Sequence, residues 1–199
     1  MGVARELRLV LMALLLSGCA VAVEGEAVVE ESVVKRSVLA PAQPLPFTPQ
    51  HAGRTNERND GTSFEPCTAY TDEEMRNLGA EPRTLKDAAI SVSPNYRGCH
   101  WQSGDGIASF SQTLGNEKSL DAYKAKQSYR PWQPDRVING RRVIVTTEDR
   151  DGCFASFMSE KAIVHSAYSV AVFGTPSPGL VSECNKAIEW ATLAISKAP

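Results

Sequence analysis

Four cysteines placed at two near-equal intervals constrain the fold of this chain more than any other feature. Cys67 and Cys99 lie 32 positions apart, and Cys153 and Cys184 lie 31 apart. Four cysteines allow three pairings; the matching intervals favour Cys67–Cys99 and Cys153–Cys184, each joining the start of a helix to a strand. Each such loop stabilises a fold by about 3–4 kcal/mol in the chain-entropy model. The alternative is a zinc site, but no Cys-x-x-Cys or His-x-x-His spacing occurs.

The fifth cysteine, Cys19, follows a leader typical of exported proteins. Arg5 and Arg8 supply a short positive region, and residues 9–16 are apolar throughout. This apolar stretch is shorter than the roughly 20 residues that span a bilayer, and it has the length of the hydrophobic part of a signal peptide. Residues 16–19, Leu-Ser-Gly-Cys, then resemble the lipobox at which bacterial lipoproteins receive a diacylglyceryl group on the cysteine.

The leader predicts an extracytoplasmic protein anchored to the cell membrane by lipid on Cys19. Acyl chains contribute about 0.8 kcal/mol per buried methylene, so two or three chains hold a protein in effect permanently. An exported location is oxidising, which allows the four remaining cysteines to form disulfides. The alternative is a plain secretory leader, or a buried N-terminal helix, that happens to contain a cysteine.

The chain is expected to divide into a leader, a tether and one folded domain. Residues 1–18 are the lipoprotein signal peptide. Residues 19–61 form the lipid anchor and a flexible tether, because they combine four prolines with a polar run at 54–61 that can bury little area. Residues 62–199 form a single extracytoplasmic domain.

Capping residues, turns and apolar periodicity locate the elements of the domain. Thr71 and Glu74 form a capping box at the start of a helix, and Gly79 ends it. Asn139-Gly140 indicates a hairpin because both residues tolerate the positive φ of a type I′ turn. The expected elements are, in order, the helix ending at Gly79, strands at 88–92, 99–101 and 108–114 with a turn at 103–106, a helix capped by Asn116, strands at 137–138, 143–145, 153–158 and 163–172, and a helix capped by Ser182.

This order predicts an α+β fold: an antiparallel sheet with helices packed on one face and two disulfides. Strand–helix–strand alternation, which would indicate a parallel sheet, does not dominate. The closing helix has an apolar stripe through Cys184, Ala187 and Ala191, which is the face expected to pack on the sheet.

Nothing in the sequence is typical of an active site, a metal site or a cofactor site. His51, His100 and His165 are expected in the tether and in strands, and the predicted disulfides leave no thiol to pair with them. Residues 32–35 match a Ser-x-x-Lys nucleophile pattern but lack its companion motifs. Residues 148–152 miss the EF-hand spacing. The formal net charge of −2 at pH 7 does not give the basic surface that nucleic acid needs.

Tyr129 and Trp132 are the expected contacts for a ligand or partner. They lie in residues 129–134, Tyr-Arg-Pro-Trp-Gln-Pro, which should form an extended exposed loop. Aromatic side chains with one polar end are enriched at binding surfaces. The alternative is a structural loop that covers the core.

Several motifs taken in order resemble those of a known family. They are Phe64-Glu65-Pro66-Cys67 before a short helix ending at Leu78-Gly79, Gly98-Cys99-His100-Trp101, the Asn139-Gly140 hairpin before a cysteine-bearing strand, and a closing helix that begins at a cysteine. Together with the lipobox, this order resembles the actinobacterial lipoproteins grouped as domain of unknown function number thirty-five fifty-eight. The resemblance covers most of the chain after the tether, and it implies an architecture and an envelope location but no chemistry.

The leading hypothesis is a lipid-anchored, non-enzymatic binding or accessory module of the cell envelope. Its partner would be an envelope protein, a lipid or a cell-wall component. The alternative is an extracytoplasmic hydrolase acting on an envelope polymer. That reaction needs an acid/base pair in a cleft, for example His165 beside a carboxylate. A purely structural spacer is a third possibility.

The substitution Cys19→Ala tests the anchor. It removes the thiol that would accept the lipid, so we expect the chain to leave the membrane fraction or to remain unprocessed. Cell fractionation and mass spectrometry of the N-terminus measure both outcomes. Membrane retention equal to that of the wild type would refute the anchor.

Overall fold

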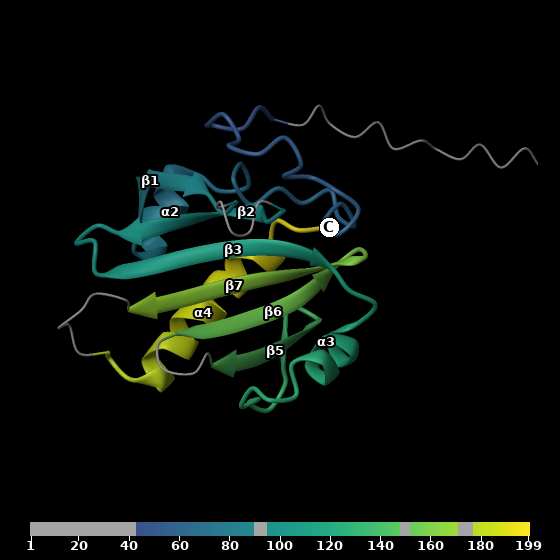
Figure 1. Ribbon diagram of the computed structural model, residues 1–199. Coiled ribbons are helices and arrows are strands. Elements are labelled where there is room, and N and C mark those ends of the chain that lie inside the picture. Colours follow the sequence, from purple (N-terminus) through teal and green to yellow (C-terminus); the bar gives the residue numbers. More distant parts are fainter. Residues whose placement is uncertain (1–42, 90–94, 148–151, 171–176) are drawn as a thin grey trace, which may run out of the picture. The chain divides into compact units, whose positions relative to one another are not determined.

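The computed structural model describes residues 43–89, 95–147, 152–170 and 177–199 (Figure 1). Within them, seven strands form one sheet in the order β1-β2-β3-β7-β6-β5-β4, and every neighbouring pair is antiparallel. The elements are α2 (Asp72–Leu78), β1 (Ala80–Asp87), β2 (Arg97–Ser103), β3 (Ala108–Asn116), α3 (Leu120–Lys126), β4 (Arg136–Ile138), β5 (Arg141–Thr147), β6 (Cys153–Ser159), β7 (Ala162–Val170) and α4 (Leu180–Ile195).

Some of the predictions concern residues outside those described. They are the leader and Cys19, the tether up to residue 42, the Ser-x-x-Lys pattern at 32–35, the strand residues Ile90 and Val92, the acidic run at 148–151, and the end of the last strand at 171–172. Among the described helices, none has the length and apolar content needed to cross a membrane.

Two hairpins form where their turn residues predict them. Asn139 and Gly140 have φ of 49° and 79°, the positive values of the predicted turn, and β4 and β5 pair on either side of it. The turn at 103–106 likewise returns the chain so that β3 pairs with β2. The capping box at Thr71 and the left-handed Gly79 that ends α2 are also confirmed.

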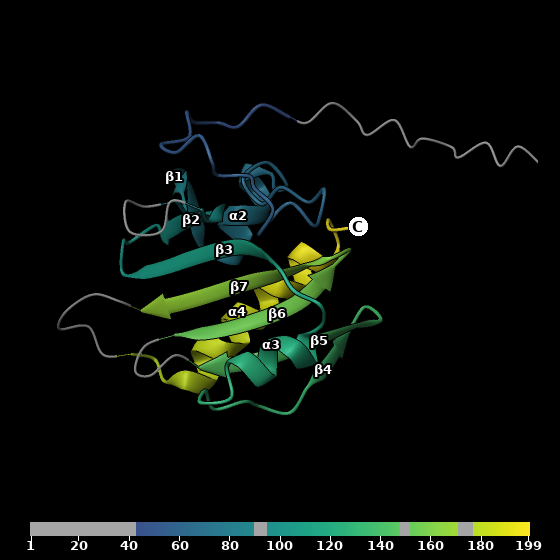
Figure 2. The ribbon, with the colours of Figure 1, turned by 45° about the vertical axis from the view of Figure 1, so that its right-hand side comes forward.

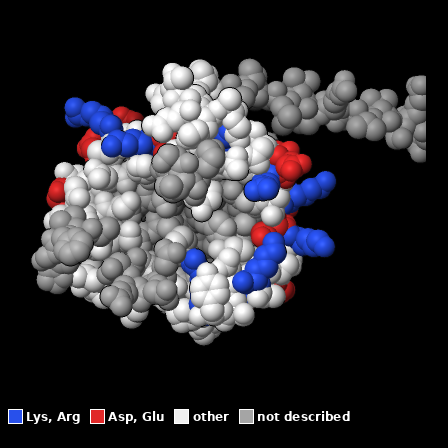
Figure 3. All heavy atoms as spheres, viewed as in Figure 1, with Lys and Arg blue, Asp and Glu red and all other residues white. Residues whose placement is uncertain are grey.

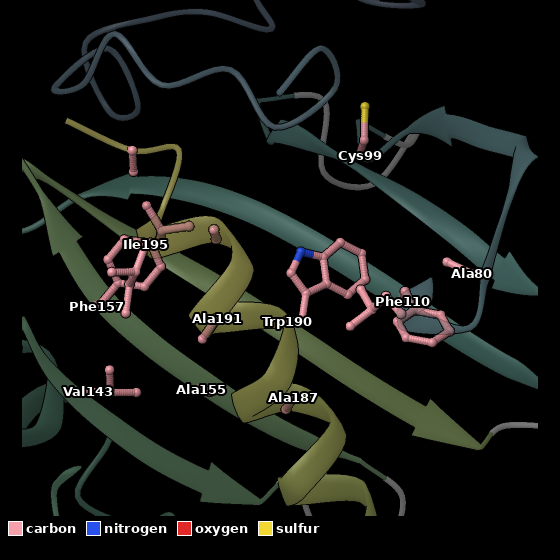
Figure 4. Close-up of a cluster of buried hydrophobic side chains, with 14 of the residues drawn as sticks. Ala80, Cys99, Phe110, Val143, Ala155, Phe157, Ala187, Trp190, Ala191 and Ile195 are labelled. Atoms are coloured by element: carbon pink, nitrogen blue, oxygen red, sulfur yellow. The ribbon is translucent and has the colours of Figure 1, made fainter. Parts of the chain in front are cut away.

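The larger hydrophobic core lies between one face of the sheet and α4. Successive strand residues point to opposite faces, and on this face β2 and β3 present Trp101 and Phe110. Trp190 of α4 meets both, with ring centroids 5.3 and 5.2 Å away. Figure 4 shows Trp190 beside Phe110. Ala187 and Ala191 of α4 are fully buried, and their small side chains let the helix lie close against the strands.

Both predicted disulfides are present. Cys67–Cys99 joins the turn before α2 to β2, and Cys153–Cys184 joins β6 to α4. All four cysteines are buried in the larger core. The second bridge therefore fastens α4 to the sheet, and the first fastens the turn that leads into α2.

The α+β fold with an antiparallel sheet is confirmed, but the helices do not all pack on one face. Leu120 of α3 packs against Ile144 and Ile163, which alternate along their strands with residues of the larger core. Helix α3 therefore covers the opposite face, in front of the sheet where α4 lies behind it (Figures 1 and 2). Tyr123 and Trp132 complete this smaller core.

Strand β1 occupies 80–87, where the sequence predicts no strand, and most of the strand expected at 88–92 lies outside the described residues. Two expected helix caps are wrong for local reasons. Ser119, whose side chain accepts from the Ala122 N–H, caps α3 in place of Asn116. Helix α4 begins at Leu180, ahead of Ser182, and Gly179 occupies its N-cap without a side-chain bond.

Residues 54–61 belong to the folded domain, and the prediction that they form a tether is wrong. Arg54 and Asn59 are only 3% and 1% exposed. The Asn59 amide donates to the carbonyls of Arg54 and Asn95, and the backbone of Gly61 exchanges hydrogen bonds with Asn116 and Lys161. These polar groups find partners inside the protein, which a composition-based argument cannot foresee.

Ile144→Ala tests the core beneath α3. Ile144 is fully buried, so its truncation should lower the free energy of unfolding by about 2–4 kcal/mol. Val137 lies on the same face of the neighbouring strand but is 76% exposed, and Val137→Ala should cost less than about 0.5 kcal/mol. Urea unfolding measures both, and equal effects would contradict the second core.

Candidate binding site

Two arginines and two carboxylates form a buried network at the start of the domain. The Arg54 guanidinium donates to Asp87 Oδ1 at 3.1 Å and to both oxygens of Glu65 at 3.0 Å. Arg97 donates to the same Glu65 at 3.2 Å. The formal charges balance, and each is held by directed hydrogen bonds, which is the condition under which charges are tolerated in an interior.

The network joins four parts of the chain that are separate in the sequence. Arg54 comes from the segment before α2, Glu65 from the turn that precedes Cys67, Asp87 from the end of β1, and Arg97 from the start of β2. Burial alone would raise the pKa of Glu65, but the hydrogen bonds and charge of Arg54, aided by Arg97, outweigh it and the net shift is downward. Glu65 is therefore ionised at neutral pH.

Asp87 has one fully used oxygen and one unused oxygen. Its Oδ1 accepts from Arg54 Nε and from the Ala89 N–H, both at 3.1 Å. The side chain is only 5% exposed, and its Oδ2 is buried without a hydrogen-bond partner among the described residues. A buried acceptor left unpaired costs about 1–3 kcal/mol.

A surface cavity of about 420 Å³ reaches Asp87. We call it the Asp87 pocket. Asp87 and Ala89 are its buried residues, while the half-buried His100 lies on β2 beside them. The remaining lining residues are Phe47, Thr48, Gln50, Leu85 and Lys86.

His100 adds a neutral donor and acceptor to the pocket. Burial lowers the pKa of His100, the charge of Lys86 lowers it further, and Asp87 opposes both without reversing the shift. The imidazole is therefore uncharged at neutral pH, with one nitrogen donating and the other accepting. The sequence predicts only that His100 lies in a strand, and no local pattern connects it to a pocket.

Hydroxyl side chains continue from His100 across the sheet, on the face opposite α4. His100 lies opposite Ser111, Ser109 opposite Ser169, and Thr113 opposite His165. We call Ser109, Ser111, Thr113 and Ser169 the hydroxyl stripe; all are half-buried. On the face seen in Figure 3, most charged side chains gather at the margins, beside charges of opposite sign.

His165 does not have the surroundings that the hydrolase hypothesis requires. Its Nδ1 lies 2.8 Å from the Ser156 hydroxyl, and the Tyr123 ring lies 4.7 Å from the imidazole. Burial, aided by the charge of Arg130, lowers the pKa of His165 to about 4. No carboxylate in the described part of the chain bonds to it, and those residues contain no group of three His, Cys, Asp or Glu able to hold a metal.

The two predicted aromatic contacts have different surroundings. Tyr129 is 71% exposed, so its role as a contact stays a prediction. Trp132 packs in the smaller core, and its indole N–H donates to the Gln127 carbonyl at 3.1 Å. This arrangement matches the alternative given for the loop, in which it covers the core.

A family model described as "Protein of unknown function (DUF3558)" matches residues 14–197. The chain belongs to this family. No curated protein and no solved structure matches the chain. The matched residues include both disulfides and the Asp87 pocket. The match confirms the domain family that the motifs resemble. The family's description gives no activity, so a function must be argued from the geometry of this member.

Arg54→Met tests the buried network. Removing the guanidinium leaves Asp87 and Glu65 without their main partner, and should cost about 3–5 kcal/mol of unfolding free energy at pH 7. Arg58→Met, at an exposed position in the same segment, should cost less than about 0.5 kcal/mol. Denaturant unfolding measures both, and equal values would mean that residues 54–61 are a tether after all.

The same pair of variants has an expected pH dependence. The pKa of Glu65 is lowered in the fold, so its contribution is complete above its ordinary pKa of 4.5 and is lost as the pH falls through the lower folded value. The gap between wild type and Arg54→Met should therefore narrow below pH 4.5.

Proposed function

We propose that this protein is a lipid-anchored lipoprotein of the cell envelope whose domain is a non-enzymatic binding module, with the Asp87 pocket as its ligand site. The observation that carries the binding role is a cavity of about 420 Å³ lined by polar and aromatic residues, among them Asp87, His100 and Phe47.

The proposed location is supported by the leader and by the disulfides. A positive region, a short apolar stretch and a lipobox precede Cys19 in that order. The four cysteines that remain form two buried bridges. Disulfides of this structural kind persist in oxidising compartments and are rare where thiols are kept reduced.

The pocket is also rigid, which favours binding. Asp87 is fixed by Arg54, and Arg54 is fixed in turn by Glu65 and by the Gly98 carbonyl at 3.2 Å. The Cys67–Cys99 bridge lies against the same guanidinium. A site held in this way loses little conformational freedom when a ligand binds, so more of the interaction energy appears as affinity.

Hydrolysis is the second candidate, and the hydrogen bond between Ser156 and His165 is the observation that favours it. A serine beside an imidazole is the first part of a nucleophile–base pair. However, Ser156 is only 1% exposed, and a buried hydroxyl cannot reach an envelope polymer without opening of the fold. The binding role is therefore preferred.

A pair of tryptophan substitutions tests the proposed binding role. Thr48→Trp places a large ring at the exposed rim of the Asp87 pocket, and Thr55→Trp places the same ring at an exposed position outside it. A ligand that binds only the native state raises the melting temperature. Detergent-solubilised envelope extract should raise the melting temperature of the full-length wild type and of Thr55→Trp, but not of Thr48→Trp. An equal rise in both variants, or none in the wild type, would refute the proposal.

A further inference from the structure

Residues 43–50 lie beside the edge strand β1, and we call them the strap. Leu45 and Phe47 are half-buried and pack against the larger core, while the prolines at 44, 46 and 49 are exposed. The Phe47 ring also lies 5.8 Å from the Arg54 guanidinium. The strap therefore contacts the domain through side chains at alternate positions.

No hydrogen bond joins the strap to the rest of the chain that the structure describes. Proline has no backbone N–H, and a proline-containing segment can leave its carbonyls to water. The residues that follow are held differently, because Arg54 and Asn59 are buried and hydrogen-bonded within the domain. Detachment of the strap would thus break the contacts of Leu45 and Phe47 and no hydrogen bond.

The strap leaves space between itself and the domain. It borders a cavity of about 440 Å³ as well as the Asp87 pocket. The strap residues that line the first cavity are Gln43, Pro44 and Pro46, and those that line the Asp87 pocket are Phe47, Thr48 and Gln50. Leu85 of β1 lines both cavities, so they are neighbours along that strand. Without the strap they would open into one groove along β1.

The domain side of this groove suits a proline-containing segment. Tyr70, Trp101 and Met75 give the first cavity an aromatic and apolar lining, and Leu85 lies where the two cavities meet. Aromatic-lined grooves bind proline-rich segments well, because such segments are extended beforehand and lose little conformational freedom. The strap itself is a segment of this kind, with Leu45 and Phe47 separated by a proline.

We propose that the groove along β1, of which the Asp87 pocket is one end, binds an extended proline-containing segment of a partner protein, and that the strap occupies the groove as an internal competitor. This inference rests on the proposed binding role of the Asp87 pocket and names the class of its ligand. The partner segment carries two large apolar side chains at alternate positions, because the strap shows which side chains the groove accepts. Its binding detaches the strap and exposes Leu45 and Phe47.

Loosening the strap tests this inference in the full-length chain in detergent. Leu45→Ser together with Phe47→Ser removes both contacts of the strap. The probe is a fluorescent peptide with the sequence of residues 43–50, Gln-Pro-Leu-Pro-Phe-Thr-Pro-Gln, and fluorescence anisotropy measures its binding. An attached segment competes at an effective concentration of about millimolar. The double variant, freed of that competition, should bind the peptide at least about tenfold more tightly than the wild type.

Matched controls locate the bound peptide. Leu180→Ser together with Val181→Ser removes two exposed apolar side chains at the start of α4, and should leave the affinity within about twofold of the wild type. Leu85→Lys, added to the double variant, places a charge where the cavities meet and should weaken peptide binding at least about tenfold. Asn77→Lys, at an exposed position of α2, should not weaken it.

The side chains of the probe are tested in the same way. A peptide with serine in place of both its leucine and its phenylalanine should bind the double variant at least about tenfold more weakly than the original peptide. Circular dichroism confirms that each variant folds. Phe47→Ser alone should give a smaller increase in affinity, so the prediction can be checked even if the double variant does not fold.

The outcomes separate the two proposals. Equal peptide affinity for wild type and loosened variants would overturn the inference, as would equal binding of the serine-containing peptide. Peptide binding that survives Leu85→Lys would place the peptide elsewhere and also overturn it. If the peptide fails but envelope extract still stabilises the protein through the Asp87 pocket, the peptide inference fails and the binding role stands. If neither extract nor peptide binds, both proposals fail.

Discussion

A single guanidinium, that of Arg54, determines how the first part of the domain is assembled. Charge cannot be left unpaired in an interior, so its burial requires Glu65 and Asp87 to be brought to it. Those two carboxylates lie in the turn before Cys67 and at the end of β1. The same side chain thus fixes the turn that carries one disulfide, the edge of the sheet, and the carboxylate of the pocket.

The Asp87 pocket results from the arrangement of this network. Arg54 uses only one oxygen of Asp87, and the segment through Phe47 lies over the other side of the network. The resulting cavity is lined by groups that were positioned for structural reasons, and one of them, Asp87, has a carboxylate oxygen without a hydrogen-bond partner among the described residues.

Features set by neighbouring residues could be predicted from the sequence, and those set by distant contacts could not. The capping box at Thr71 and the turn at Asn139 depend on a few adjacent residues, and the disulfide pairing was predicted from two near-equal cysteine intervals. The position of α3 on the second face depends on its contacts with Ile144 and Ile163. These residues lie in strands that are buried on both faces, which becomes evident only once the order of the strands in the sheet is known. Arg54 stands in a polar run, and no local signal distinguishes it from its solvated neighbours.

The disulfide that joins α4 to β6 affects when the protein can fold. Helix α4 is the last element of the chain, yet it covers the middle of the sheet and is bonded to β6 through Cys153–Cys184. The central pair β3 and β7 likewise joins residues about 50 positions apart, and such non-local contacts form slowly. A chain built in this way has no complete core until α4 is available. Under the export proposed above, the domain would stay open while it threads through a translocation channel, and it would close only after α4 has crossed.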